Sequence, residues 1–408
     1  MTNITCRGCS LLCDDLTVRI ENQKLIDHVH ACPLAKNWIQ DSLQVVSAEK
    51  QEDAPENLSL AKKWLDNAIS PLICGLQGLT LEAESKVVEL ANQRNARLSA
   101  GTSPDKFTTY QRYGGATCTL GEVHQRADLV LVGNCDLLAI WPRFAQQYLA
   151  KPGRFISPEQ PRELIFLGDA SLLDKTSQYS QIIDIPGDQL DQAVLLLRRI
   201  IQKQSIKQAD SELTSQLEKL ADKLLAAWYP VLFHDDSLKQ NGFLWTKLVN
   251  EVNQLSRMHS LNVTAGVSKG AASETILAMT GFPDHIAFCG ATPEDDETEI
   301  LHDSLRYEAS QLIQNQNTDL VIFAGDQLSK KWLETLQNLA PPAKLIVIHS
   351  GITKLPRFNV PVLEILTQTP GIHETGTALR CDGVPLPLHA VATSQLPTIC
   401  DVMASLKN

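Results

Sequence analysis

The chain has 408 residues, of which 43% are hydrophobic and 20% are charged, and its formal net charge is −11. At roughly 100–200 residues per domain, this length predicts two to four domains, each able to bury a core of its own. The composition excludes collagen, coiled coils and disordered chains, and no apolar run approaches the roughly 18 residues of a membrane span. The acidic balance argues against nucleic-acid partners, whose binding relies on clustered Lys and Arg.

The N-terminal segment bears on where the protein works. Met1–Cys6 has neither the basic nor the apolar region of a secretory signal, so we expect a cytoplasmic protein without a membrane partner. In that compartment the ten cysteines are expected to be free thiols or metal ligands rather than disulfides.

The predicted elements begin with a β-hairpin and continue as an α/β pattern. Apolar residues alternate through 16–20 and 25–29 around a polar turn at 21–23, as in a hairpin. Further along, short runs rich in Val, Ile and Leu alternate with segments of helical period, such as Leu81–Arg94 and Gln189–Ile201. This pattern predicts parallel strands buried on both faces. The expected strands are Pro71–Leu76, Leu129–Val132, Leu164–Leu167, Pro230–Phe233, Leu320–Ala324 and Lys344–His349.

Two polar segments without strand signals, Ser47–Leu60 and Gln202–Lys223, indicate domain boundaries. The fold class we expect is α/β, with a small N-terminal cysteine module of the iron–sulfur type followed by two Rossmann-like parallel-sheet domains. The expected limits are 1–53 for the module, 54–105 together with 225–408 for a discontinuous first α/β domain, and 106–224 for the second.

Two similar segments suggest that the α/β domains share a topology. Arg126–Asp136 and Asn317–Asp326 both contain a helix end, an aspartate, a strand and a glycine turn, in that order. The similarity is too short to establish an internal duplication.

The most specific motif is the cysteine set Cys6-x2-Cys9-x3-Cys13-x18-Cys32. Thiolates at these gaps can converge on one metal ion or cluster. Zinc ribbons prefer two Cys-x2-Cys pairs, so this spacing favours a [4Fe–4S] cluster; the alternative is a set of buried cysteines that binds nothing. His28 and His30 lie on the same face as Cys32 if the chain is extended, either as ligands or neighbours of the metal or as ordinary packing residues. We interpret the remaining cysteines as core residues: Cys74, Cys118, Cys135, Cys289, Cys381 and Cys400.

These cysteines belong to a longer stretch that resembles a known protein family. Thr5–Leu16 followed by Cys32–Ala35 resembles the N-terminus of the B subunit of formylmethanofuran dehydrogenase, in the molybdopterin oxidoreductase superfamily. The resemblance implies a cluster module and two Rossmann-like domains, in agreement with the pattern of elements. Similar motifs follow in the same order at Cys118–Asp128, Gly133–Arg143, Asn262–Gly266 and Glu374–Pro385.

The chain departs from the redox-active members of that family. They bind tungsten or molybdenum through two pterin dinucleotides and the cysteine of a Cys-His dipeptide upstream of the Thr-Leu-Gly-Glu-Val motif, and this sequence contains no Cys-His dipeptide. The corresponding region, Gly101–Phe107, offers no thiolate, and the turn at Phe166–Ser171 differs from the usual pterin-binding turn. Five carboxylates within Gly290–Glu299 would repel a polyanionic pterin ligand. We therefore expect the tungsten- or molybdenum-bis-pterin guanine dinucleotide to be absent.

The resemblance is strongest to the B subunit of the bacterial formyltransferase/hydrolase complex, which works in tetrahydromethanopterin-linked C1 metabolism. It implies a structural, non-redox subunit, without catalytic residues of its own, whose partners are an amidohydrolase-like A subunit, a formyltransferase D subunit and a C subunit. One alternative is a redox subunit with an oxygen ligand for the metal, such as Ser103 or Asp105. Another is a zinc-module protein that binds nucleic acid, against which the net charge and the long α/β portion argue.

Overall fold

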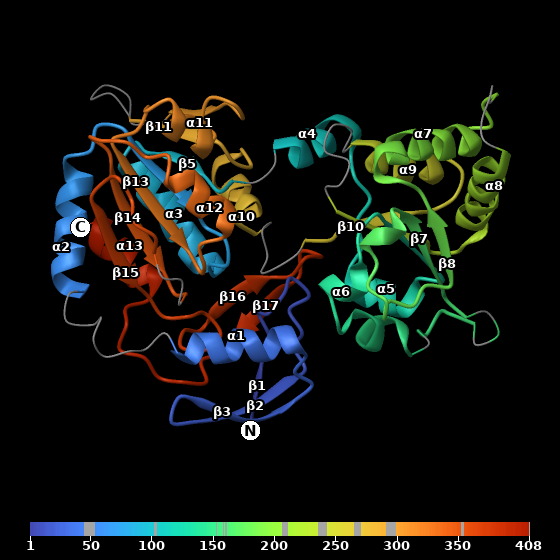
Figure 1. The fold of residues 1–408 in the computed structure, drawn as a ribbon, viewed down its shortest axis with the longest axis horizontal. Helices are drawn as coiled ribbons and strands as arrows, with labels where there is room; N and C mark the ends of the chain where they lie inside the picture. Colours follow the sequence, from blue (N-terminus) through green and yellow to red (C-terminus); the bar gives the residue numbers. More distant parts are fainter. Residues whose placement is uncertain are drawn as a thin grey trace. The chain divides into compact units, whose positions relative to one another are not determined.

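The computed structural model describes residues 1–44, 54–101, 104–151, 153–157, 159, 161–205, 211–235, 243–264, 271–290, 299–351 and 355–407. The chain divides into two compact units (Figure 1). Unit 1 comprises Met1–Ser103, Gly266–Arg380 and Pro385–Asn408, and unit 2 comprises Pro104–Ala265 and Cys381–Val384. In the part of the chain that is described, no helix has the length and apolar character needed to span a bilayer.

Unit 1 begins with a small antiparallel sheet of β1 (Thr2–Ile4), β2 (Leu16–Glu21) and β3 (Lys24–Val29). The hairpin between β2 and β3 confirms the prediction from the alternating residues. Its turn residues, Asn22 and Gln23, have φ of 50° and 57°, the left-handed conformation that a two-residue hairpin turn needs. Helix α1 (Pro33–Gln44) follows directly.

The large sheet of unit 1 has seven strands in the order β12-β11-β5-β4-β13-β14-β15. The five strands from β5 to β15 are parallel, whereas β11 is antiparallel to both β5 and β12. A separate ribbon pairs β16 (Gly376–Leu379) with β17 (Pro385–Leu388). The bounds of the large sheet are β4 Pro71–Gly75, β5 Arg97–Ser99, β11 Ile286–Cys289, β12 Glu299–His302, β13 Leu320–Gly325, β14 Lys344–His349 and β15 Val362–Leu366.

Helices cover both faces of this sheet, because its central strands are apolar on both sides. One face packs against α2 (Ala54–Asp66), α3 (Leu81–Gln93), α10 (Ala271–Thr280) and α13 (Ile399–Lys407). The opposite face packs against α11 (Ala309–Gln314) and α12 (Lys330–Leu336).

Unit 2 is built on a five-stranded sheet in the order β10-β9-β6-β7-β8, in which every pairing is parallel. Its strands are β6 (Leu129–Gly133), β7 (Glu163–Gly168), β8 (Gln181–Asp184), β9 (Val231–His234) and β10 (His259–Asn262). All six strands expected from the sequence are present in the two sheets, which confirms the parallel α/β fold class.

One face of the unit 2 sheet packs against the three helices α7 (Leu190–Ile201), α8 (Ser211–Ala226) and α9 (Phe243–Asn253). The remaining helical segments are α4 (Pro104–Tyr113), α5 (Leu120–Arg126), α6 (Leu137–Ile140), the π-helical turn η2 (Ala145–Leu149), and the 3-10 turns η3 (Ala170–Leu172) and η4 (Gly187–Gln189).

The position of β9 and β10 differs from the sequence-based division. We expected 225–408 to belong to the first α/β domain, but β9 pairs with β6 and β10 pairs with β9, so both strands lie in unit 2. A short buried parallel strand has the same sequence pattern in either sheet, so the sequence could not assign it. The separate status of the module at 1–53 stays a prediction.

Candidate functional site

The four predicted ligands lie around the loop between β1 and β2 and at the start of α1. The loop is closed by Cys6 N donating to Cys13 O at 2.8 Å and Leu12 N donating to Cys9 O at 3.3 Å. Cys32 O accepts from Lys36 N at 3.0 Å and so caps the first turn of α1. A Cβ on Gly8 would lie 2.7 Å from the backbone of Leu34, so a glycine is needed where the loop passes this helix.

The thiols share one buried environment. Cys6, Cys9 and Cys13 are buried and Cys32 is half-buried. Burial raises the pKa of the Cys6 thiol, and Cys13, Cys9 and Cys32 raise it further by electrostatic interaction. Burial also raises the pKa of Cys9 to about 11, with a contribution from Cys32. Four thiolates in this space would need a compensating positive charge, which a metal ion or cluster supplies.

The four cysteine thiols are therefore chemically suitable ligands for a metal ion or an iron–sulfur cluster. The amide of Gly8 also donates to Cys6 Sγ at 3.4 Å, as amides do around ligand sulfurs. However, within the described residues no group of three or more Cys, His, Asp or Glu side chains is arranged to hold a metal ion. The ligand role of Cys6, Cys9, Cys13 and Cys32 stays a prediction.

His28 and His30 do not share one extended segment with Cys32. His28 lies in β3 opposite Val18, but β3 ends at Val29 and His30 has φ of 65°. The alternation assumed for this segment therefore stops before Cys32.

Arg7, between two of the cysteines, attaches the loop to the large sheet of unit 1. Its side chain is only 1% exposed. Nη2 donates to Gly78 O, Nη1 donates to Pro370 O at 3.3 Å, and the guanidinium lies 4.0 Å from Asp326 Oδ2. Gly78 and Asp326 follow β4 and β13, so Arg7 lies at the carboxyl ends of parallel strands, where ligand sites of α/β folds occur.

Further buried carboxylates surround this arginine. Burial raises the pKa of Glu84 to about 8 and that of Glu374 to about 7, and in both cases Arg7 opposes the shift. Burial lowers the pKa of His373 to about 4. Several buried polar atoms here have no hydrogen-bond partner among the described residues, namely Arg7 Nε, Asp326 Oδ2, His373 Nε2 and Glu374 Oε2. Unpaired buried polar atoms are uncommon in proteins, so this acidic cluster of Glu84, Asp326 and Glu374 around Arg7 is a candidate ligand site.

Sequence reasoning did not identify this acidic cluster. The available signal was the order of elements, because Gly78 and Asp326 each follow a predicted strand. The order of elements does not show how deeply Arg7 and these carboxylates are buried, because their burial depends on residues far apart in the sequence.

The regions in which the chain departs from the redox family are only partly described. Ser103 lies outside the described residues, as do the side chain of Asp105 and residues 291–298 of the acidic run. Cys74 is buried inside β4, and Cys118 is buried just before α5, where burial raises its pKa to about 12. The turn after β7 is formed by Gly168, with φ of 152°, and Asp169 N donates to Asn134 Oδ1 at 2.8 Å.

No family model matches the chain. It is 21% identical over 435 aligned residues to the B subunit of the tungsten-containing formylmethanofuran dehydrogenase 2 of Methanocaldococcus jannaschii, covering 95% of this chain and 93% of the relative. The corresponding protein of Methanococcus maripaludis is 21% identical over 421 residues, with the same coverages. The chain is a distant homologue of the B subunit of formylmethanofuran dehydrogenase. The resemblance inferred from the sequence motifs is thus confirmed.

The fold of this chain agrees with a solved structure. The chain superposes on a chain of the formyltransferase/hydrolase complex from Methylorubrum extorquens, solved in complex with methylofuran, with a TM-score of 0.72 and 18% identity. The superposition covers 88% of this chain and 96% of that chain. At this identity the likeness supports the fold.

Proposed function

We propose that this chain is the B-type subunit of a formyltransferase/hydrolase complex in tetrahydromethanopterin-linked C1 metabolism, and that it acts as a structural, non-redox subunit. Two observations together support the proposal. The chain keeps the fold over 96% of a chain from such a complex, yet its sequence has no Cys-His dipeptide to supply the metal thiolate of the redox relatives.

The missing metal thiolate favours hydrolysis over redox chemistry. Interconversion of a formyl group and CO2 moves two electrons and needs a redox-active metal held by a protein donor. Hydrolysis of a formyl amide needs only water: attack on the formyl carbon and cleavage of the C–N bond give formate and the free amine, with no electron transferred. The partners would be an amidohydrolase-like A subunit that releases formate, a formyltransferase D subunit and a C subunit, all in the cytoplasm.

We also propose that Cys6, Cys9, Cys13 and Cys32 hold a [4Fe–4S] cluster with a structural role, whereas no tungsten- or molybdenum-bis-pterin is bound. Support comes from the spacing of the four cysteines, their shared burial and the Gly8 amide directed at Cys6 Sγ. A cluster in this loop would stabilise the segment between β1 and β2.

The test uses the purified complex. It should convert the formylated carrier to formate without an electron acceptor, and viologen reduction coupled to CO2 formation should be undetectable. Elemental analysis should find neither tungsten nor molybdenum. About one tungsten or molybdenum per complex, with dye reduction that disappears when this chain is omitted, would overturn the proposal and restore the dehydrogenase function.

A further inference from the structure

One face of the unit 2 sheet is thinly covered. The connection from β6 to β7 contains only the four-residue α6 and the five-residue η2 among its described residues, and the connection from β7 to β8 contains only the three-residue η3. Full-length helices cover the opposite face instead. Parallel sheets normally carry full-length helices on both faces. On this face only short helical segments are described, and Leu164 of β7 is half-buried there whereas Val130 of β6 is fully buried.

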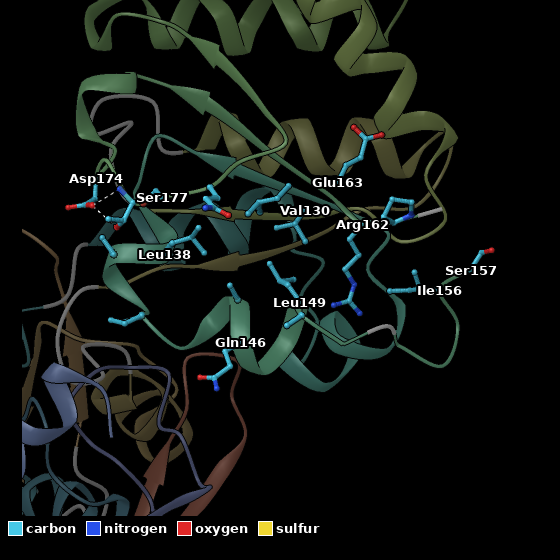
Figure 2. A pocket seen from close by; sticks show the side chains of 18 residues that line it. Val130, Leu138, Gln146, Leu149, Ile156, Ser157, Arg162, Glu163, Asp174 and Ser177 are labelled. Carbon is cyan, nitrogen blue, oxygen red and sulfur yellow. Dashed lines mark hydrogen bonds between the residues drawn. The ribbon is translucent and has the colours of Figure 1, made fainter. Parts of the chain in front are cut away.

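A pocket of about 980 Å³ lies on this face (Figure 2). Val130 of β6 and Leu164 of β7 are paired neighbours that form its floor. Leu138, Leu149 and Ile156 line it from the connecting segments. Its volume is at the upper end of the roughly 300–1,000 Å³ of small-molecule sites, and such sites are mostly apolar with few polar groups.

Arg162 supplies the positive charge of the pocket. Nη1 donates to Tyr148 O and Nη2 donates to His124 O, while Nε is buried without a hydrogen-bond partner in the described structure. Burial lowers the pKa of this guanidinium, and no carboxylate in the described part of the chain opposes the shift. The arginine is therefore partly desolvated with only neutral carbonyls as partners there, an arrangement that an incoming anion would stabilise.

The carboxylates that line the pocket are already engaged. Glu163 forms an ion pair with Lys223. Asp174 lies far from Arg162 in Figure 2 and accepts from Thr176 N at 2.8 Å and Thr176 Oγ1 at 2.6 Å. Neither neutralises Arg162.

Two further arginines lie near the segment 124–126. The backbone O of His124 accepts a hydrogen bond from Arg162, and the backbone O of Gln125 accepts one from Phe155 N at 3.1 Å. Phe155 is 64% exposed, and the guanidinium carbons of Arg126 and Arg154 lie 5.2 and 5.8 Å from its ring centroid. An accessible aromatic ring with two further cations therefore directly precedes Ile156, a residue of the pocket lining.

We propose that this pocket binds a small organic carboxylate with an aliphatic or aromatic body, whose carboxylate pairs with Arg162 and whose body contacts Leu138, Leu149 and Leu164. The site is separate from the cysteine loop and does not depend on the structural role proposed above.

The test is calorimetric titration of the full chain, expressed with a solubilising fusion partner, with 4-phenylbutyrate, with octanoate and with the neutral 4-phenylbutanamide. Both acids should bind saturably, and the amide should bind about tenfold more weakly, because it lacks the charge. Arg162→Met should weaken binding of the acids about tenfold and leave the amide unchanged. The control Lys175→Met removes the same charge from an exposed residue outside the pocket lining and should bind like the parent chain.

A second variant keeps the proposal testable if Arg162→Met fails to fold. Ala139 is exposed in the pocket lining, so Ala139→Phe should narrow the pocket and weaken binding of all three probes while circular dichroism is unchanged. Absence of saturable acid binding by the parent chain, or equal binding by Ala139→Phe, would overturn the proposal. Acid binding to the chain that disappears in the assembled complex would assign the pocket to a partner protein and would also overturn it.

Discussion

Arg7 joins the cysteine loop to the acidic cluster of unit 1. It contacts Gly78, Pro370 and Asp326, and it lowers the pKa of both Glu84 and Glu374 against the effect of burial. A buried cation is stable only when its donors have partners and its charge is compensated. The buried carboxylates provide that compensation, so the cysteine loop and the acidic cluster are electrostatically coupled.

The buried Glu84 of the acidic cluster predicts a pH-dependent stability. The pKa of Glu84 in the folded chain, about 8, lies above its ordinary value of 4.5. Between these values the folded chain binds more protons than the unfolded chain, so the free energy of unfolding falls as pH rises. Glu84→Gln can still accept the hydrogen bond of Thr275 and cannot ionise. We expect it to be more stable than the parent by on the order of 5 kcal/mol at pH 9, and to match it near pH 4.

Urea denaturation at the two pH values measures this difference. The control Glu56→Gln changes an exposed glutamate of α2 and should show the parent's pH dependence. A Glu84→Gln variant with that same pH dependence would show that Glu84 does not ionise in this range.

The cysteine loop predicts a metal content. Anaerobically purified chain should hold about four iron atoms and show the broad visible absorption of thiolate-to-iron charge transfer. Cys9→Ser should lose both, whereas Cys289→Ser, outside the motif, should retain them. Parent protein with neither iron nor zinc would contradict a ligand role for the four cysteines.

Two aspartates show that the similar segments of the sequence have similar structural roles. Asp319, just before β13, accepts from Ile69 N at 2.7 Å and Ser70 N at 2.9 Å, next to β4. Asp128, just before β6, accepts from Trp228 N at 2.7 Å and Tyr229 N at 2.8 Å, next to β9. Each carboxylate thus holds the beginning of the adjacent parallel strand. The expected similarity of topology is supported by this shared pairing of strands.

Removal of either aspartate should weaken its sheet. Asp319→Ala and Asp128→Ala each leave two backbone N–H groups without their charged acceptor, so we expect a loss of about 1–3 kcal/mol in the free energy of unfolding. Asp222→Ala, at an exposed position of α8, serves as the control in urea denaturation. If both variants matched this control, the aspartates would have no role in strand placement.

At the scale of the whole molecule, the chain keeps the fold found in a multi-subunit complex over nearly its full length. Unit 2 also exposes large apolar side chains at Leu172, Ile182 and Trp228, with exposed fractions of 49%, 48% and 83%. Exposed apolar residues of this kind are compatible with contacts to other subunits.

We therefore expect the chain to be poorly soluble when expressed alone and to form a stable hetero-oligomer with amidohydrolase-like and formyltransferase subunits. Size-exclusion chromatography of the single chain and of the co-expressed set measures this. A monodisperse, folded monomer that does not associate with the other subunits would contradict the expectation.

The sequence by itself determined the local features of the protein. Alternation predicted the hairpin of β2 and β3, runs of Val, Ile and Leu predicted the central strands, and spacing identified Cys6, Cys9, Cys13 and Cys32 as one set. These features depend on neighbours along the chain, and the sequence displays such neighbours directly.

Only the tertiary structure decided which distant residues meet. It placed β9 and β10 in the sheet of β6, buried Arg7 against Gly78 and Asp326, and left Arg162 facing a pocket with no carboxylate partner among the described residues. Strand order and the burial of a charge depend on packing between segments that are tens to hundreds of residues apart. A parallel strand has the same apolar pattern in either sheet, and an arginine has the same sequence signal whether it is buried or exposed, so only packing distinguishes these cases.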